Sequence, residues 1–378
     1  MILGNARILA GDGLIPKGWL RIHDRVIDAY GPGDALEPAE MDLAGRWLVP
    51  GFVDVHVHGA LGHSFDEADS EDGTRAADAI TRHHLGYGTT TLLASLVSAP
   101  VADLERRVRA LAPRVADGTL GGIHLEGPFL SAARCGAHAP AHLRPPTADA
   151  LDRLLAAGDG TVRMITIAPE LPGAVDAVAR IVRAGVVAAI GHTDADYETV
   201  RAAIDAGATV ATHLYNGMPP IAGRAPGPVP ALLHDPRVLV ELIADGFHLH
   251  PATLRRAGSD AAERFMLVSD AMAATGAGDG DYVLGSQRVR VAGGQARLID
   301  GDSLAGSTLT LARALRTAVE AGIAPLAALG AMTATPARAL GLAHRAGAIA
   351  VGRAADLVVL DEDLAVHAIF RAGQRLRP

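Results

Sequence analysis

The feature that most constrains the fold of this 378-residue chain is an alternation, through its middle, of short apolar runs and alanine-rich amphipathic stretches. The apolar runs are continuous, as strands buried on both faces of a parallel sheet require. Eight such units fit a (β/α)8 barrel, a TIM-type α/β fold, in number and length. A doubly wound open sheet is the alternative. The predicted strands are 52–58, 89–96, 122–126, 162–168, 186–192, 209–214, 238–244 and 265–269, and the predicted helices include 101–116, 148–157, 172–184 and 195–206.

The two ends of the chain have a different character from its middle. Residues 1–50 and 346–378 alternate short apolar runs with Gly, Asp and Pro, which is typical of small β-hairpins. Because chain ends often lie close together, we expect one small β-sandwich domain built from both termini. The barrel then spans 51–345 and carries a β-hairpin insert near 277–302.

Composition argues against several classes of protein. The 34 Lys and Arg against 42 Asp and Glu give a formal net charge of −8 without a basic block, so we expect no nucleic-acid partner. The longest charge-poor stretch is interrupted by Gly, Thr and Pro and does not predict a membrane span. The single cysteine, Cys135, excludes an intrachain disulfide. With an N-terminus unlike a signal peptide, it favours a cytoplasmic location.

Polar side chains stand at the carboxyl ends of the predicted strands, where the active site of a parallel barrel lies. His56 and His58 end the first strand and share one face of it, because side chains two residues apart point the same way. We expect four histidines and two carboxylates to meet at one mouth of the barrel. The other strand-end residues are Glu126, His192, His213 and Asp270, with Asn216, Asp245 and His248 close behind them.

This set of imidazoles and carboxylates predicts a metal site. It suits a borderline divalent cation, with Zn²⁺ the first choice and Fe²⁺ the alternative. The only lysine, Lys17, lies outside the predicted barrel, so a carbamylated lysine cannot bridge two metal ions. A native carboxylate must serve instead, and Glu126 is placed for it. Asp270 is then free to accept a proton from water whose pKa a metal lowers to about 7.

Several motifs resemble the N-acetylglucosamine-6-phosphate deacetylase family of the amidohydrolase superfamily. They are LVPGFVDVHVHG (48–59), GGIHLEGPFLS (121–131), GAH (136–138), TIAPE (166–170), GHTDA (191–195), ATHLYNGMPP (211–220), GRAPG (223–227), IADGFHLH (243–250), LVSDAMAATG (267–276) and LAGSTLTL (304–311). The resemblance covers almost the whole chain. It implies a metal-dependent hydrolase of amino-sugar catabolism that converts N-acetyl-D-glucosamine 6-phosphate to D-glucosamine 6-phosphate and acetate.

The resemblance also implies a role for each residue at the mouth. Asp270 matches the catalytic base and acid, and His138 matches a residue that contacts the substrate near the scissile amide. The second metal site is complete in this sequence, so one or two divalent ions per subunit are expected. The implied ligands are Glu126, His192 and His213 for the main ion, and His56 and His58 for the second.

A sugar-phosphate pocket and a homodimer follow from the same resemblance. Arg224 lies in the Gly- and Pro-rich loop GRAPG, and a guanidinium suits a phosphate through paired hydrogen bonds. The arginine that corresponds to Arg224 reaches the phosphate bound by the neighbouring subunit. His248 can add a hydrogen-bond donor. The other residues implied in the pocket are Asn216, Gly217, Ala137, Leu304, Ala305 and Gly306.

Other functions stay open at this point. N-acetylgalactosamine 6-phosphate differs from the expected substrate at one hydroxyl, and another amidohydrolase could act on a cyclic amide. A catalytically silent metal-binding protein would be expected to lack a ligand or Asp270, and neither is missing. His124 is interpreted as a barrel-interior partner of the ligands. Cys135 is interpreted as a thiol in a loop near the pocket, not as a nucleophile.

Overall fold

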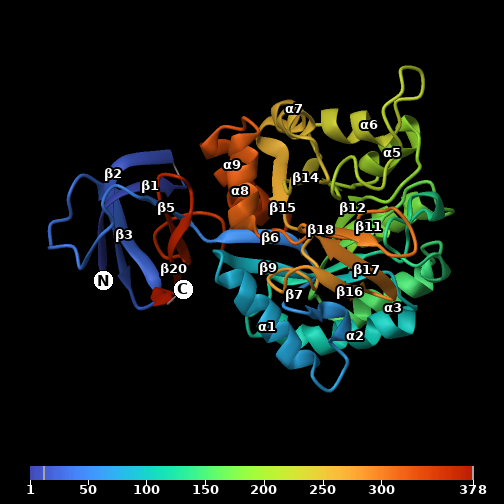
Figure 1. Ribbon diagram of the computed structural model, residues 1–378, viewed down its shortest axis with the longest axis horizontal. Helices are drawn as coiled ribbons and strands as arrows, with labels where there is room; N and C mark the ends of the chain where they lie inside the picture. Colours follow the sequence, from blue (N-terminus) through green and yellow to red (C-terminus); the bar gives the residue numbers. More distant parts are fainter. Residues whose placement is uncertain (12, 377–378) are drawn as a thin grey trace.

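An eight-stranded parallel sheet forms the centre of the computed structural model, which describes residues 1–11 and 13–376 (Figure 1). The strands lie side by side in chain order, and Val57 forms a parallel bridge with Ala271 that brings the two ends of the sheet together. The fold is the predicted barrel, nearly closed, and the open-sheet alternative is wrong. Its strands are β6 (Phe52–Val57), β9 (Thr89–Val97), β10 (Gly122–Glu126), β11 (Val162–Ile167), β12 (Val187–Ile190), β13 (Val210–Ala211), β14 (Leu239–Ile243) and β15 (Phe265–Val268).

Helices surround the barrel and shield its strands from water (Figure 1). The predicted helix 101–116 is α2 to the residue, and the other three predictions agree with α3, α4 and α5 to within two residues at each end. Among the described helices, none is long and apolar enough to cross a membrane. The helices are α1 (Gly73–Leu85), α2 (Val101–Ala116), α3 (Ala148–Gly158), α4 (Ala174–Arg183), α5 (Tyr197–Asp205), α6 (Pro228–His234), α7 (Pro251–Ala261), α8 (Leu311–Glu320), α9 (Pro325–Met332) and α10 (Ala334–Ala339), with short 3-10 turns at Phe65–Glu67, Ala132–Arg134, Pro140–His142 and Ala262–Arg264.

The two ends of the chain form one mixed sheet beside the barrel, on the left in Figure 1. Val26 of the edge strand β3 forms a bridge with Ala354, shortly before β19, and the sheet has an apolar core of its own. The division of the chain into 1–50 plus 346–378 and 51–345 stays a prediction. The strands are β1 (Ile2–Ala10), β2 (Gly13–His23), β3 (Val26–Pro32), β4 (Met41–Asp42), β5 (Trp47–Pro50), β19 (Leu357–Leu360), β20 (Val366–Arg371) and β21 (Gln374–Leu376).

The insert after β15 has one strand more than the hairpin expected near 277–302. It is an antiparallel sheet of β16 (Gly280–Leu284), β17 (Gln287–Ala292) and β18 (Gln295–Leu298). The third strand exists because Gly293 and Gly294 both adopt positive φ angles and turn the chain back on itself. A smaller two-stranded sheet, β7 (Gly59–Ala60) with β8 (His63–Ser64), follows the first barrel strand.

Candidate active site and metal centre

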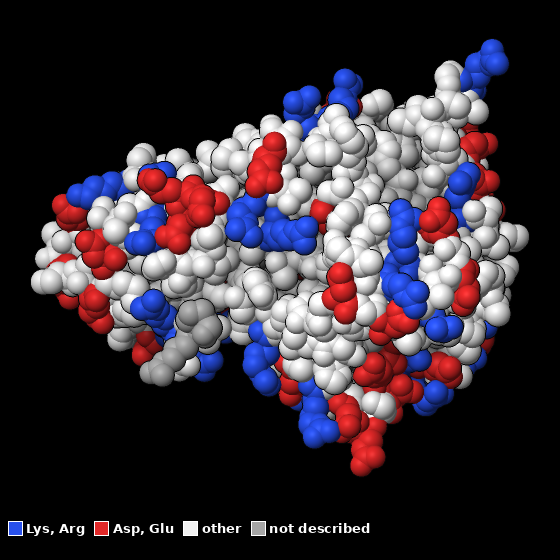
Figure 2. Space-filling model, viewed as in Figure 1, with Lys and Arg blue, Asp and Glu red and all other residues white. Residues whose placement is uncertain are grey.

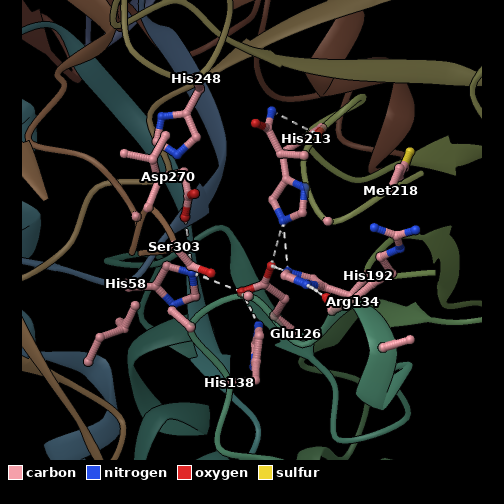
Figure 3. A pocket seen from close by; sticks show the side chains of 18 residues that line it. His58, Glu126, Arg134, His138, His192, His213, Met218, His248, Asp270 and Ser303 are labelled. Atoms are coloured by element: carbon pink, nitrogen blue, oxygen red, sulfur yellow. Dashed lines mark hydrogen bonds and ion pairs between the residues drawn. The ribbon is translucent and has the colours of Figure 1, made fainter. Parts of the chain in front are cut away.

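A cavity of about 340 Å³ opens at the carboxyl ends of the barrel strands. Figure 3 shows the imidazoles of His138, His192 and His213 pointing toward one carboxylate, that of Glu126. The strand-end residues predicted to meet at the mouth do so, because each follows its strand at the same end of the barrel.

Glu126 is the centre of this cluster, and its two carboxylate oxygens face different histidines. Oε1 lies 3.1 Å from Nε2 of His192 and 2.9 Å from Nε2 of His213. Oε2 lies 3.4 Å from Nε2 of His56 and 3.2 Å from Nε2 of His58. One carboxylate therefore divides the cluster into two halves.

Each half has the composition of a metal site. One group is His56, His58 and Glu126, and the other is Glu126, His192 and His213; within each group the donor atoms lie within 4.8 Å of one another. All five residues are buried, and their nitrogen and oxygen donors fit Zn²⁺ or a similar divalent ion. We call the first group the β6 subsite and the second group the main subsite.

The hydrogen bonds of the Nδ1 atoms, which face away from Glu126, show why these histidines can act as ligands. A carboxylate or backbone carbonyl can only accept a hydrogen bond, so in the neutral ring the proton stays on Nδ1 and the Nε2 lone pair faces Glu126. Three of the four histidines have such a partner for Nδ1. Nδ1 of His56 donates to Glu241 Oε2 at 3.1 Å, that of His58 to the Ser95 carbonyl at 3.2 Å, and that of His192 to the Arg134 carbonyl at 2.8 Å.

His138 has the opposite tautomer and cannot act in the same way. Its Nδ1 accepts the backbone N–H of Ser98 at 3.2 Å, so the ring proton lies on Nε2, which points at Glu126 Oε2 from 3.4 Å. Burial lowers the pKa of His138 to about 4, which keeps the ring neutral. The site therefore holds His138 as a hydrogen-bond donor rather than a ligand.

Without a metal ion, the histidines of the β6 subsite and the two carboxyl groups beside them have strongly shifted pKa values. Burial by itself would lower the pKa of an imidazole, but the carboxylates of Glu126 and Asp270 outweigh it. They raise the pKa of His56 well above its usual value and that of His58 to about 9. Burial opposes ionisation of the two carboxyl groups, yet the nearby histidines hold the pKa of Glu126 and of Asp270 below the usual range. At neutral pH the β6 subsite therefore holds protons that a cation must displace.

Asp270 lies beside the β6 subsite, where it can meet a substrate. Its Oδ1 is 3.3 Å from Nε2 of His58 and 3.6 Å from Nε2 of His56, and the side chain lines the cavity. Its backbone N–H donates to the His56 carbonyl at 2.9 Å. Asp270, His192 and His213 all have positive φ angles, a costly conformation that concentrates at functional sites.

Two glycines of the sequence motifs pack closely against the ring of His192. Gly136 and Gly217 have positive φ angles, and a Cβ added to them would lie 3.0 Å and 2.9 Å from atoms of that ring. Any larger residue would displace the imidazole. The small residues of GAH and NGM therefore fix the position of a ligand as well as the shape of the cavity.

The structure gathers most of the residues predicted to bind the sugar phosphate. Arg224 and Ala305 are the exceptions. Arg224 lies in an exposed part of the chain and does not line the cavity. The loop between β13 and α6, which holds Arg224, extends away from the barrel at the upper right of Figure 1. Figure 2 shows Lys and Arg interspersed with Asp and Glu over this face of the molecule. Ala305 is fully buried behind the wall. The cavity is lined by the other six: Ala137, Asn216, Gly217, His248, Leu304 and Gly306.

Two neighbours of the site have hydrogen-bond partners that fix their positions, and His124 lies inside the barrel as predicted. His124 lies between Ser95 Oγ at 2.9 Å and Thr166 Oγ1 at 2.8 Å, and burial holds its pKa well below the usual value. Asp245 accepts a hydrogen bond from Nδ1 of His248 at 2.7 Å and fixes that ring.

Sequence reasoning missed Glu241 and Arg134. Glu241 is fully buried in β14 against His56, and its one visible signal was a charged residue inside an apolar run. Arg134 lines the cavity next to Cys135, and among the cavity-lining residues of the described chain it is the only Lys or Arg. Its position between Glu126 and His138 in the sequence was the available signal.

The barrel and its cluster define a class of enzyme that comparison with known proteins identifies. The chain belongs to the amidohydrolase family, whose model matches residues 47–376. It is 36% identical over 381 residues to N-acetylgalactosamine-6-phosphate deacetylase of Escherichia coli O157:H7, which covers 99% of this chain and 98% of the relative. It is also 36% identical over 386 residues to N-acetylglucosamine-6-phosphate deacetylase of Bos taurus, over 98% of this chain and 94% of the relative.

A solved structure resembles the chain over its whole length. A mutant of N-acetyl-D-glucosamine-6-phosphate deacetylase from Mycobacterium smegmatis, solved in complex with N-acetyl-D-glucosamine-6-phosphate, is 48% identical and has a TM-score of 0.95. The match covers 99% of this chain and 98% of the other. The family named by the sequence motifs is therefore confirmed.

Proposed function

We propose that this protein hydrolyses N-acetyl-D-glucosamine 6-phosphate to D-glucosamine 6-phosphate and acetate. The observation that carries the proposal is the cluster itself: one carboxylate shared by two pairs of imidazoles, with Asp270 beside it on the wall of the cavity. The full-length similarity to deacetylases of both sugar epimers supports the substrate class.

The residues of the cavity divide the work of amide hydrolysis. A divalent ion held by Glu126 and the histidines would polarise the amide carbonyl and lower the pKa of a water molecule. Asp270, ionised at neutral pH, accepts a proton as the water oxygen adds to the carbonyl carbon. The C–N bond then breaks, and Asp270 returns the proton to the departing amine. His138 donates from Nε2 to the oxyanion that forms.

The metal complement is part of the proposal. We propose Zn²⁺ as the natural ion and Fe²⁺ as the alternative, because both accept this donor set. Glu126 has one oxygen for each subsite, which supports two ions per chain. Filling of the β6 subsite then depends on pH, because His56 and His58 must lose protons.

We further propose that two copies of the chain assemble so that Arg224 of one meets the sugar phosphate in the other. The cavity offers His248 and Asn216 to the phosphate end, while Arg224 lies exposed outside it. A partner's guanidinium would supply the charge that a phosphate dianion needs. The cytoplasm is the proposed compartment, since a single cysteine suits a reducing environment.

The proposal is tested by acetate release from the purified, metal-loaded protein. N-acetylglucosamine 6-phosphate, its galactosamine epimer and unphosphorylated N-acetylglucosamine are compared at equal concentration. We expect the glucosamine phosphate to have the highest kcat/KM and the unphosphorylated sugar the lowest. A higher value for the galactosamine epimer would select the alternative substrate, and equal values with and without phosphate would contradict the phosphate subsite.

A further inference from the structure

A buried carboxylate on β14, that of Glu241, contacts both halves of the histidine cluster without belonging to either metal group. Its side chain is fully inaccessible to water. The same oxygen, Oε2, lies 3.1 Å from Nδ1 of His56 and 3.1 Å from the backbone nitrogen of His213. The other oxygen, Oε1, is buried and has no hydrogen-bond partner in the described chain. A charged group placed there is costly, so its contacts need an explanation.

The contact with His56 decides which ring nitrogen can bind a cation. Because the carboxylate of Glu241 only accepts, the proton of a neutral His56 stays on Nδ1. Nε2 is then left with its lone pair, 3.1 Å from Nε2 of His58 and 3.4 Å from Oε2 of Glu126. A carboxylate behind a histidine also makes the ring a stronger ligand.

The contact with His213 acts on the backbone. His213 has a φ angle of 27°, a conformation that a residue with a side chain rarely adopts. Its N–H donates to Glu241 Oε2, and the following residue, Leu214, donates its N–H to the Glu241 carbonyl at 2.9 Å. Glu241 therefore anchors the turn that aims His213 at Glu126.

We propose that Glu241 is a positioning residue that makes the β6 subsite competent to bind a metal ion. It also fixes the ring of His56 and the backbone of His213 relative to each other. The inference rests on the metal centre of the proposed function. Glu241 bonds the ring of His56 but only the backbone of His213, so its loss weakens the β6 subsite more than the main subsite. A purely structural carboxylate would affect both ions equally or neither.

The substitution Glu241→Gln tests this, because it keeps the size of the side chain and one accepting oxygen but removes the charge. Metal-free protein is titrated with Zn²⁺ alone by calorimetry, and bound zinc is counted by elemental analysis. We expect the wild type to bind two ions. The variant should bind the main ion with little change in affinity and the second ion about 10- to 100-fold more weakly, the usual effect of losing a residue that hydrogen-bonds a metal ligand. Glu105→Gln is the matched control, since Glu105 lies on α2 and pairs with Arg153.

A double variant distinguishes an effect through His56 from general damage. His56→Asn alone should lose the second ion and keep the main ion, and adding Glu241→Gln should leave the affinity for the main ion unchanged, whereas general damage would weaken it. Equal weakening of both ions, an unchanged second ion, or a wild type that binds only one ion would each overturn the proposal. If Glu241→Gln does not fold, Glu241→Asp keeps the charge but shortens its reach, and the same loss of the second ion is expected.

Failure of this inference can be told apart from failure of the proposed function. The zinc titration contains no substrate, whereas acetate release by wild type tests the reaction alone. A wild type that releases acetate while Glu241→Gln binds both ions normally would overturn only the role of Glu241.

Discussion

The two pairs of histidines on either side of Glu126 are held in different ways. His56 lies in β6 and His58 follows the last residue of that strand, and both are almost inaccessible to water. His192 and His213 follow two different strands, and both have positive φ angles. The β6 pair is held at the end of a single strand and is protonated when metal-free, whereas the main pair depends on two strained turns. The difference indicates that one subsite is limited by protons and the other by backbone geometry.

The largest expected effect comes from the residue that the two pairs share. Glu126→Gln replaces one of the two oxygens, so neither subsite keeps its carboxylate. We expect bound metal to fall at both subsites and acetate release to fall below detection. Elemental analysis and an acetate assay check this. Retention of both ions would show that the halves do not depend on a common ligand.

Asp270→Asn should separate chemistry from metal binding. The asparagine side chain can neither take up nor return a proton at neutral pH. Turnover should therefore fall by about 10²- to 10⁴-fold, the usual contribution of a general acid–base group. Bound metal should remain, because Asp270 lies outside both metal groups. Near-normal kcat in this variant would remove Asp270 from the proposed role.

Matched substitutions in the two pairs compare the subsites directly. We expect His213→Asn to lose the main ion and most of the turnover. His56→Asn should keep the main ion and lower kcat by about tenfold, which corresponds to about 1.4 kcal/mol of activation free energy. Metal content and kcat are measured for both variants. An equal loss in each would mean that the two subsites fill only together.

The smallest effect on turnover should come from the pH dependence of metal binding at the β6 subsite. The carboxylates raise the pKa of His58 to about 9, so this ring carries its proton at pH 7 and zinc must displace it. Affinity for the second ion should therefore rise by about tenfold per pH unit from 7 to 9 for each proton released, and less steeply above the pKa of His58. Calorimetry in buffers of different ionisation enthalpy counts the protons released. An affinity that is flat over this range would contradict the protonated β6 subsite.

Much of the site could be predicted because parallel strands share a direction. His56, His58, Glu126, His192 and Asp270 each follow an apolar run, and a barrel brings all such ends to one mouth. No comparable rule exists for Glu241, because its partner His56 is 185 positions away in the sequence and meets it only in the interior of the closed barrel.

The sequence by itself determined the barrel and the kinds of side chain at its mouth, because hydrophobic periodicity and strand-end position are local properties. It could not decide which nitrogen of each histidine faces inward. That choice depends on the Ser98 amide behind His138 and the Glu241 carboxylate behind His56. These features were decided only by the tertiary structure, since hydrogen-bond partners and distances between distant segments exist only once the barrel has closed.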